Sequence, residues 1–252
     1  MGKVYLIGAG PGAADLITVR GAHILARADI VFYDALIHHD VLAIAQHAEK
    51  VLVGKRCGKY STVQQFINKR LIDAARKYDI VVRLKGGDPM LFGRAQEEIA
   101  ALQKAGIDYD VIPGVTAALA ASAELGVSLT ERGVARSVTF VTPRTGEGAP
   151  INHWIESVLA ADTAVIYMGW GEAEEIASAL IKNGKSPTTP VVVMENVSLP
   201  NAKKVFTVLK QLPKIAEQHF TGPVVIMLGE VYRRSQIAES RAIVSKLKMS
   251  RG

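Results

Sequence analysis

Short apolar runs alternate with segments of helical spacing along the first half of the chain. This alternation is typical of β-α-β units, in which the strands run parallel and helices cover the faces of the sheet. Asp15 has the residue type of a helix N-cap and is expected to open the first helix. The expected strands are residues 3–8, 29–33, 50–53, 80–84 and 108–112, and the expected helices are residues 15–27, 62–77 and 96–104.

A second set of elements follows Pro113 and Gly114, which interrupt the pattern. Because no long helix separates the last two strands, this end of the chain is predicted to be mixed or antiparallel. We therefore expect two α/β domains with a cleft between them, residues 1–113 and 114–240, and a basic tail at 241–252. The expected strands are residues 137–141, 164–168, 191–195, 204–208 and 224–228, and the expected helices are residues 116–124, 154–159 and 173–182.

Charge and composition narrow the class of protein. The formal net charge is +6, but residues 233–252 hold six basic residues and one acidic residue, so the body is close to neutral and a nucleic acid partner is not expected. The first apolar run is too short for a signal sequence or a membrane span, and the single cysteine, Cys57, excludes an internal disulfide. His38, His39 and Asp40 have no other clustered ligands, so no metal is expected. These features favour a cytoplasmic protein.

Two adjacent glycines, Gly86 and Gly87, follow the strand expected at residues 80–84. Without Cβ atoms at this turn, a ligand can approach the main chain closely, and ligands bind beyond the carboxyl ends of parallel strands. Asp88 adds a carboxylate there, and Pro89 stiffens the exit. The alternative is a tight turn in which Asp88 caps the next helix. The chain has no G-x-x-x-x-G-K-[ST] loop, so the residues favour a cationic or hydroxyl-rich ligand over a phosphate.

The first loop, GAGPGA at residues 8–13, offers a competing interpretation. It fits G-x-G-x-x-[GA], and Asp34 ends the second strand where a dinucleotide-binding fold places its ribose-binding acid. Pro11 removes one backbone N–H and Gly12 loosens the turn, which makes the loop less suited to a pyrophosphate. At the carboxyl edge of the sheet, Asp34 could instead accept a proton.

Several cations are expected near the same edge. Lys55 and Arg56 follow the third strand, and Arg132 lies near the expected cleft. Fixed cations at such an edge suit the carboxylate groups of a substrate. Arg94 opens the helix at residues 96–104, where a carboxylate ligand or a pair with Glu97 or Glu98 would offset its unfavourable position against the helix dipole.

Taken together, the motifs resemble the tetrapyrrole methyltransferase superfamily, and within it the uroporphyrinogen-III C-methyltransferase branch. The matching segments, in order, are VYLIGAGPG at 4–12, YDAL at 33–36, VGKR at 53–56, RLKGGDP at 83–89, FGR at 92–94, PGVTAA at 113–118, YMG at 167–169 and GPVV at 222–225. The resemblance implies a tetrapyrrole methylase-like fold and a homodimer. It also implies S-adenosyl-L-methionine-dependent methylation of uroporphyrinogen III at carbons 2 and 7, giving precorrin-2 for sirohaem or cobalamin synthesis.

The resemblance further implies roles for individual residues. Asp34 matches the proton acceptor and Lys55 the proton donor, while Arg94, Glu97 and Arg132 match substrate-side positions. The base could be Asp34 or Arg94, and the chemistry favours Asp34 because arginine is almost always protonated. The positions implied for the cofactor site are Pro11, Gly86, Gly87, Asp88, Leu91, Thr116, Ala117, Met168 and Val197.

Two other classes of function stay open. One is a sister enzyme of the same fold that acts on a later corrin precursor or on ribosomal RNA. The RNA version predicts a continuous basic surface and binding that weakens steeply with salt, whereas the excess basic charge of this chain lies in its tail. The other is a non-catalytic NAD-binding module built on residues 8–13 and Asp34.

Overall fold

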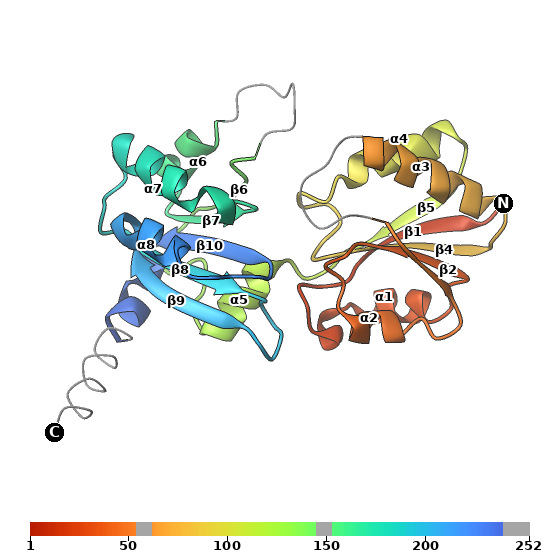
Figure 1. The fold of residues 1–252 in the computed structure, drawn as a ribbon, viewed down its shortest axis with the longest axis horizontal. Helices are drawn as coiled ribbons and strands as arrows, with labels where there is room; N and C mark the ends of the chain where they lie inside the picture. The colour runs from red at the N-terminus through yellow and green to blue at the C-terminus, as the bar shows by residue number, and fades with distance from the viewer. Residues whose placement is uncertain (54–61, 145–152, 239–252) are drawn as a thin grey trace. The chain divides into compact units, whose positions relative to one another are not determined.

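The computed structural model describes residues 1–53, 62–144 and 153–238 (Figure 1). Its contacts divide the chain into two compact units, Met1–Ala117 and Ala118–Gly252, each built around a five-stranded sheet. Both units combine a sheet with helices, which confirms the predicted α/β class. Within the residues that the structure describes, no helix is both long and apolar enough to cross a membrane.

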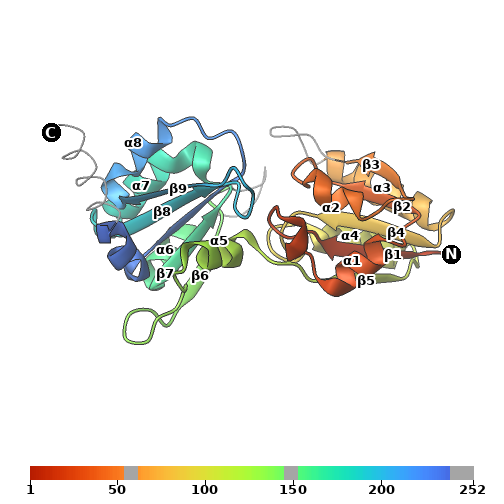
Figure 2. The same ribbon diagram turned by 90° about the horizontal axis from the view of Figure 1, so that it is seen from below.

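The sheet of the first unit is entirely parallel, in the order β3-β2-β4-β1-β5. Its strands are β1 (Lys3–Gly8), β2 (Ile30–Tyr33), β3 (Glu49–Leu52), β4 (Ile80–Lys85) and β5 (Tyr109–Ile112). Helices α1 (Val19–Leu25) and α2 (His39–Ala43) cover one face, and α3 (Thr62–Ala75) and α4 (Ala95–Lys104) cover the other (Figures 1 and 2).

Two apolar clusters hold the helices against this sheet. Leu71 of α3 and Leu102 of α4 pack with Val81 of β4 on one face. Leu25 of α1 packs with Leu84 on the other. Because successive side chains of a strand point to opposite faces, residues at odd positions of β4 face α3 and α4.

The neighbouring strands β1 and β4 form the topological switch point of the sheet. The chain leaves β1 toward β2 through α1, and it leaves β4 toward β5 through α4 on the opposite face. Loops that depart in opposite directions from neighbouring parallel strands create the crevice where such sheets bind ligands. The loops that contain residues 8–13 and 86–89 both start at this point.

The helix expected over residues 15–27 is wrong in its first part. Residues Ala14–Leu16 form a short 3-10 turn, and the α-helix begins only at Val19. Thr18 has an extended backbone (φ −67°, ψ 148°), and its side chain accepts a 3.1 Å hydrogen bond from the N–H of Gly21. Thr18, not Asp15, is therefore the N-cap of α1.

The second unit has a mixed sheet, in the order β6-β7-β10-β8-β9. Only the β6–β7 pair of these neighbours is parallel, as the sequence predicted for a mixed end. Helices α6 and α7 cover one face, and α5 lies on the other side (Figures 1 and 2). The strands are β6 (Val138–Val141), β7 (Thr163–Tyr167), β8 (Pro190–Glu195), β9 (Lys203–Val208) and β10 (Val224–Gly229), and the helices are α5 (Ala117–Leu125), α6 (Trp154–Ala160), α7 (Ala173–Lys182) and α8 (Leu212–Ala216).

Candidate functional site

Three loops meet at the carboxyl edge of the first sheet. Gly10, after β1, and Gly87, after β4, form an isolated antiparallel bridge. The N–H of Gly87 donates to the carbonyl oxygen of Gly10 at 2.7 Å, and the reverse bond is 3.3 Å long. Both glycines have positive φ angles, +77° and +66°, a conformation that glycine adopts without strain. Gly114, after β5, packs against the same two loops. At the switch point, the three loops therefore contact one another through the backbone of glycines, which we call the glycine platform (Gly10, Gly87 and Gly114).

The carboxylate of Asp88 stabilises this glycine platform with two hydrogen bonds. Its Oδ1 accepts a 2.8 Å hydrogen bond from the N–H of Met90, and its Oδ2 accepts one of the same length from the N–H of Gly114. The first bond closes a local turn, but Asp88 does not cap the next helix as the alternative interpretation expected, because the N-cap of α4 is Arg94. The second bond joins loops that are 26 residues apart in the chain. Direct contact of Asp88 with a ligand remains a proposal.

Gly86 lies beside the glycine platform and leaves space next to its main chain. A Cβ atom built on Gly86 would meet no atom of the described residues within 4 Å. On Gly87, it would lie 3.9 Å from the Cα of Thr116 and from the carbonyl oxygen of Val115. A ligand therefore has room to approach the main chain at residues 86 and 87. Pro11 and Thr116 lie on the loops that the glycines join, and Ala117 is the first residue of α5. Half-buried Leu91 follows Asp88 by three residues.

The remaining two cofactor candidates belong to the second unit. Met168 follows β7, and Val197 lies two residues beyond β8. Both strands pair antiparallel with β10, so they run in the same direction and their carboxyl ends share one edge of that sheet. The side chain of Met168 is exposed, whereas Val197 is buried.

Backbone strain marks the same positions. Five non-glycine residues in the described part of the chain have a positive φ: Phe92, Arg94, Met168, Asn196 and Ser198. Arg94 and Met168 are predicted site residues themselves. The other three are neighbours of predicted site residues, since Phe92 follows Leu91, and Asn196 and Ser198 flank Val197. A left-handed conformation in a non-glycine residue costs about 1–3 kcal/mol and is concentrated at functional sites. These left-handed residues include, or lie next to, predicted site residues, whose role stays a prediction.

A buried ionic network that sequence reasoning missed lies beneath the edge of the first sheet. Arg83 of β4 donates from Nη2 to Oδ1 of Asp34 at 2.6 Å and from Nε to Oε1 of Glu98 at 3.1 Å. Lys85 Nζ lies 3.0 Å from each oxygen of Glu98, and Gln64 Nε2 donates to Oε1 at 3.1 Å. The side chains of Arg83, Lys85 and Glu98 are at most 4% exposed.

Two opposed effects set the protonation of the buried cations. Burial alone would lower the pKa of Arg83, but the charges of Asp34 and Glu98 and their hydrogen bonds outweigh it and raise that pKa. Burial and the charge of Arg83 lower the pKa of Lys85, against the opposing effect of Glu98. The sequence did carry a signal for this network, because two cations at alternate positions of an apolar strand point to one buried face and require an anion there.

Arg94 and Glu97 form an exposed pair at the start of α4. Arg94 is the N-cap residue in a left-handed conformation (φ 55°). Its Nε and Nη2 atoms each donate a 2.7 Å hydrogen bond to an oxygen of Glu97. The bond to Glu97 raises the pKa of Arg94, and the same bond lowers the pKa of Glu97. The pair with Glu97 is thus formed, whereas Glu98 is buried in the ionic network.

The other predicted cations lie elsewhere. Arg132 is exposed in the second unit, inside a turn closed by a bridge between Glu131 and Ala135. Lys55 and Arg56 fall outside the described residues. The structure therefore does not place Lys55 relative to Asp34.

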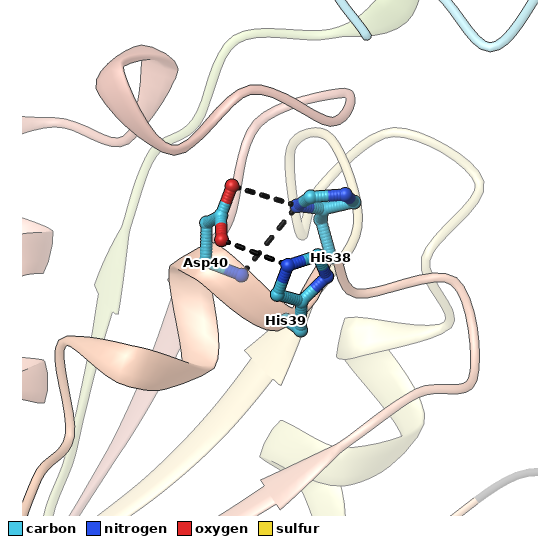
Figure 3. A group of neighbouring side chains, drawn as sticks. All are labelled: His38, His39 and Asp40. Atoms are coloured by element: carbon cyan, nitrogen blue, oxygen red, sulfur yellow. Dashed lines mark hydrogen bonds and ion pairs between the residues drawn. The ribbon is translucent and has the colours of Figure 1, made fainter. Parts of the chain in front are cut away.

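His38, His39 and Asp40 bond with one another at the start of α2 (Figure 3). His38 Nδ1 accepts a 3.4 Å hydrogen bond from the N–H of Asp40, and His39 Nε2 lies 3.0 Å from Oδ1 of Asp40. One potential ligand atom from each residue lies within 4.8 Å of the others. The three residues are consecutive in the chain, so their own contacts suffice to bring the ligand atoms together. The expectation of no metal stays a prediction.

Comparison with known proteins places these features in context. The family model for tetrapyrrole (corrin/porphyrin) methylases matches residues 3–213. The siroheme synthases of Zymomonas mobilis and Actinobacillus pleuropneumoniae are 43% and 42% identical over 91% and 92% of this chain. These matches cover 49% and 48% of the two relatives, so the chain spans about half their length.

Solved structures match over most of their own length. Uroporphyrin-III C-methyltransferase from Thermus thermophilus, in complex with S-adenosyl homocysteine, is 38% identical with a TM-score of 0.81, over 92% of this chain and 99% of that one. A cobalt precorrin-4 methyltransferase is 29% identical with a TM-score of 0.79, over 91% and 95% of the two chains.

Proposed function

The chain belongs to the tetrapyrrole (corrin/porphyrin) methylase family, and from this premise we propose that it methylates uroporphyrinogen III at carbons 2 and 7 to give precorrin-2, with S-adenosyl-L-methionine as methyl donor. The match to the uroporphyrin-III C-methyltransferase solved with S-adenosyl homocysteine carries this proposal, because it spans 99% of that chain. The name of the curated relatives, siroheme synthase, supports a role of the product in sirohaem synthesis.

The residues of this chain fit the proposed methyl donor. Open space in front of Gly86 leaves the main chain accessible to a ligand. When bound, S-adenosyl-L-methionine supplies an electrophilic methyl group on a sulfonium ion. We propose that its site is formed by Pro11, Gly86, Gly87, Asp88, Leu91, Thr116, Ala117, Met168 and Val197. Asp88 acts here mainly by holding the loops of residues 88–90 and 114 in place.

The proposed reaction also needs a base. Transfer of a methyl cation to a neutral macrocycle leaves a positive charge, which is relieved when the macrocycle loses a proton. We assign this proton to Asp34, whose side chain is about one-third exposed (32%) at the carboxyl edge of the sheet. Arg94 is a poor base because its bond to Glu97 raises its pKa. Lys55 remains the proposed proton donor.

The substrate brings eight carboxylates, which need cations on the protein. Arg94 and Arg132 are exposed and are proposed to bind them. Glu97 would then act by orienting the guanidinium of Arg94 through its two hydrogen bonds. We further propose a cytoplasmic homodimer whose product serves sirohaem or cobalamin synthesis, and light scattering of the purified protein would test the dimer.

Incubation with uroporphyrinogen III and a labelled methyl donor tests the function directly. We expect the pigment to gain the mass of two methyl groups. Arg94→Ala should retain its affinity for S-adenosyl homocysteine in calorimetry and lose turnover. If the protein methylates only a later corrin precursor or ribosomal RNA, the substrate assignment is wrong. Tight binding of NAD without affinity for S-adenosyl homocysteine would contradict the whole proposal.

A further inference from the structure

Glu98 is an ionisable residue to which no binding or catalytic role has been assigned. Its side chain is completely buried, although it lies in the first turn of α4, close to an exposed surface. Placing a carboxylate in the interior is unfavourable unless cations and hydrogen-bond donors surround it. Glu98 has three such donors, from Arg83, Lys85 and Gln64. A hydrophobic group of similar size could fill the same space, so the charge itself calls for an explanation.

The guanidinium of Arg83 is held from both ends. Its Nε donates to Glu98 and its Nη2 donates to Asp34. Its Nη1 donates to the carbonyl oxygens of Leu84 and Phe32, at 3.1 Å and 3.5 Å. A planar group that is bound on three nitrogens has little freedom to rotate, so the position of Glu98 determines the position of Nη2.

The two oxygens of Asp34 differ in their surroundings. Oδ1 accepts the short bond from Arg83. No hydrogen bond to Oδ2 comes from residues 1–53, 62–144 or 153–238, and the side chain is partly exposed. One oxygen is thus fixed by the network, and the other faces no donor from this part of the chain. This is the arrangement that a directed proton acceptor needs, because geometry within hydrogen-bond reach comes before proton affinity.

We propose that Glu98 is a positioning residue for proton transfer to Asp34, acting through Arg83. The inference rests on the proposed function, in which Asp34 accepts a proton from the methylated macrocycle. In that step, a C–H bond of the macrocycle breaks, its electron pair stays in the ring system, and an O–H bond forms on Oδ2 of Asp34. Lys85 balances the charge, since Asp34 and Glu98 then face two cations, Arg83 and Lys85.

The test compares two variants. Glu98→Gln leaves the two buried cations with one anion, so it risks misfolding. The double variant Lys85→Met/Glu98→Met keeps Arg83 and Asp34 as a neutral pair and removes the acceptor at Nε together with the Lys85 ammonium, because methionine offers no oxygen to Arg83. The matched control is Lys69→Met/Asp73→Asn, which removes an exposed pair of α3 (2.6 Å). Circular dichroism and thermal melting show which variants are folded.

We expect the double variant to lose catalytic rate but to keep its binding of substrate and cofactor product. In the folded Lys85→Met/Glu98→Met variant, kcat for methylation of uroporphyrinogen III should fall at least about tenfold, while KM and the affinity for S-adenosyl homocysteine change by less than about threefold. The control should match the wild type. Unchanged kcat, or a rise in KM at unchanged kcat, would overturn the proposal. A wild-type protein that binds S-adenosyl homocysteine but never methylates this substrate would refute the proposed function itself.

Two further measurements separate a positioning role from a purely structural one. In an Asp34→Asn background, the Glu98 substitution should cause no further loss of single-turnover rate, because both act on one step. An equal loss in both backgrounds would overturn the proposal. A crystal structure of the ligand-free double variant should show Asp34 displaced from Nη2 of Arg83. An undisturbed Asp34 there would show that Glu98 does not position it, whatever the substrate.

Discussion

The backbone of Gly114 packs directly against the carbonyl oxygen of Gly87. A Cβ atom on Gly114 would overlap with that oxygen and would lie 2.8 Å from the Cα of Gly8. A Cβ atom on Gly86, one residue before Gly87, would meet nothing within 4 Å in the part of the chain that the structure describes. Glycine is therefore required at 114 by close packing of two loops, whereas at 86 it leaves room for something outside the chain.

These two glycines should respond differently to alanine. Gly114→Ala is expected to destabilise the protein by about 1–3 kcal/mol, because rigid backbone atoms would have to move. Gly86→Ala should leave stability within about 1 kcal/mol but weaken binding of S-adenosyl homocysteine, because its methyl group enters the open space. Urea unfolding and calorimetry measure the two effects. Full affinity in Gly86→Ala would place the ligand elsewhere.

Asp88 should matter for stability as well as for binding. In Asp88→Asn, one of the two backbone N–H donors faces an amide instead of a carboxylate oxygen. Loss of one hydrogen bond to a charged group is expected to cost about 1.5–3 kcal/mol. Because the bonds of Asp88 to the N–H groups of Met90 and Gly114 hold the two loops in place, affinity for S-adenosyl homocysteine should fall too. If Asp88→Asn unfolded in urea with the stability of the wild type but no longer bound S-adenosyl homocysteine, direct contact of Asp88 with the ligand would be indicated instead.

The sequence predicted the layers of this fold well because they depend on local patterns. Alternating strand and helix signals predicted the parallel first sheet, and the lack of long helices near the end predicted the mixed second sheet. The contacts of Asp88 with Gly114 and of Arg83 with Asp34 join residues 26 and 49 positions apart. Such pairs depend on the order of strands in the sheet, which spacing along a single chain does not reveal.

The start of α1 provides a local test of the corrected N-cap. Thr18→Ala should cost about 1 kcal/mol, because the N–H of Gly21 loses its acceptor. Asp15→Ala should change stability by less than about 0.5 kcal/mol, since Asp15 is exposed and lies outside the helix. Urea unfolding of both variants decides between them. A larger loss in Asp15→Ala would restore the cap expected from the sequence.

Asp162 makes the stability of the second unit depend on pH. Its Oδ2 accepts bonds from the N–H groups of Arg136 and Ser137 and from the Ser137 hydroxyl, at 2.8–3.0 Å. Hydrogen bonds from the Arg136 N–H, then from the Ser137 hydroxyl and N–H, lower the pKa of Asp162 from its usual 3.8. In acid, the unfolded chain therefore binds a proton more readily than the folded one.

The contribution of Asp162 is accordingly complete above pH 3.8 and is lost as the pH falls through the lower pKa of the folded state. Asp162→Asn should be less stable near neutral pH and should show a shallower decline of its urea midpoint between pH 5 and pH 2. If the urea midpoints of the variant and the wild type fell equally steeply between pH 5 and pH 2, this linkage would be excluded. Asp110→Asn, which removes an exposed partner of Lys3, serves as a comparison on the first unit.

Strand β1 lies between β4 and β5, so both its partners are made long after it. During synthesis, the apolar segment Lys3–Gly8 must wait until residue 112 exists before both of its edges are paired. At about 5–20 residues per second, that interval lasts on the order of 5–20 seconds. A nascent chain paused before β5 should therefore be a preferred client of ribosome-associated chaperones, whereas one paused after it should not.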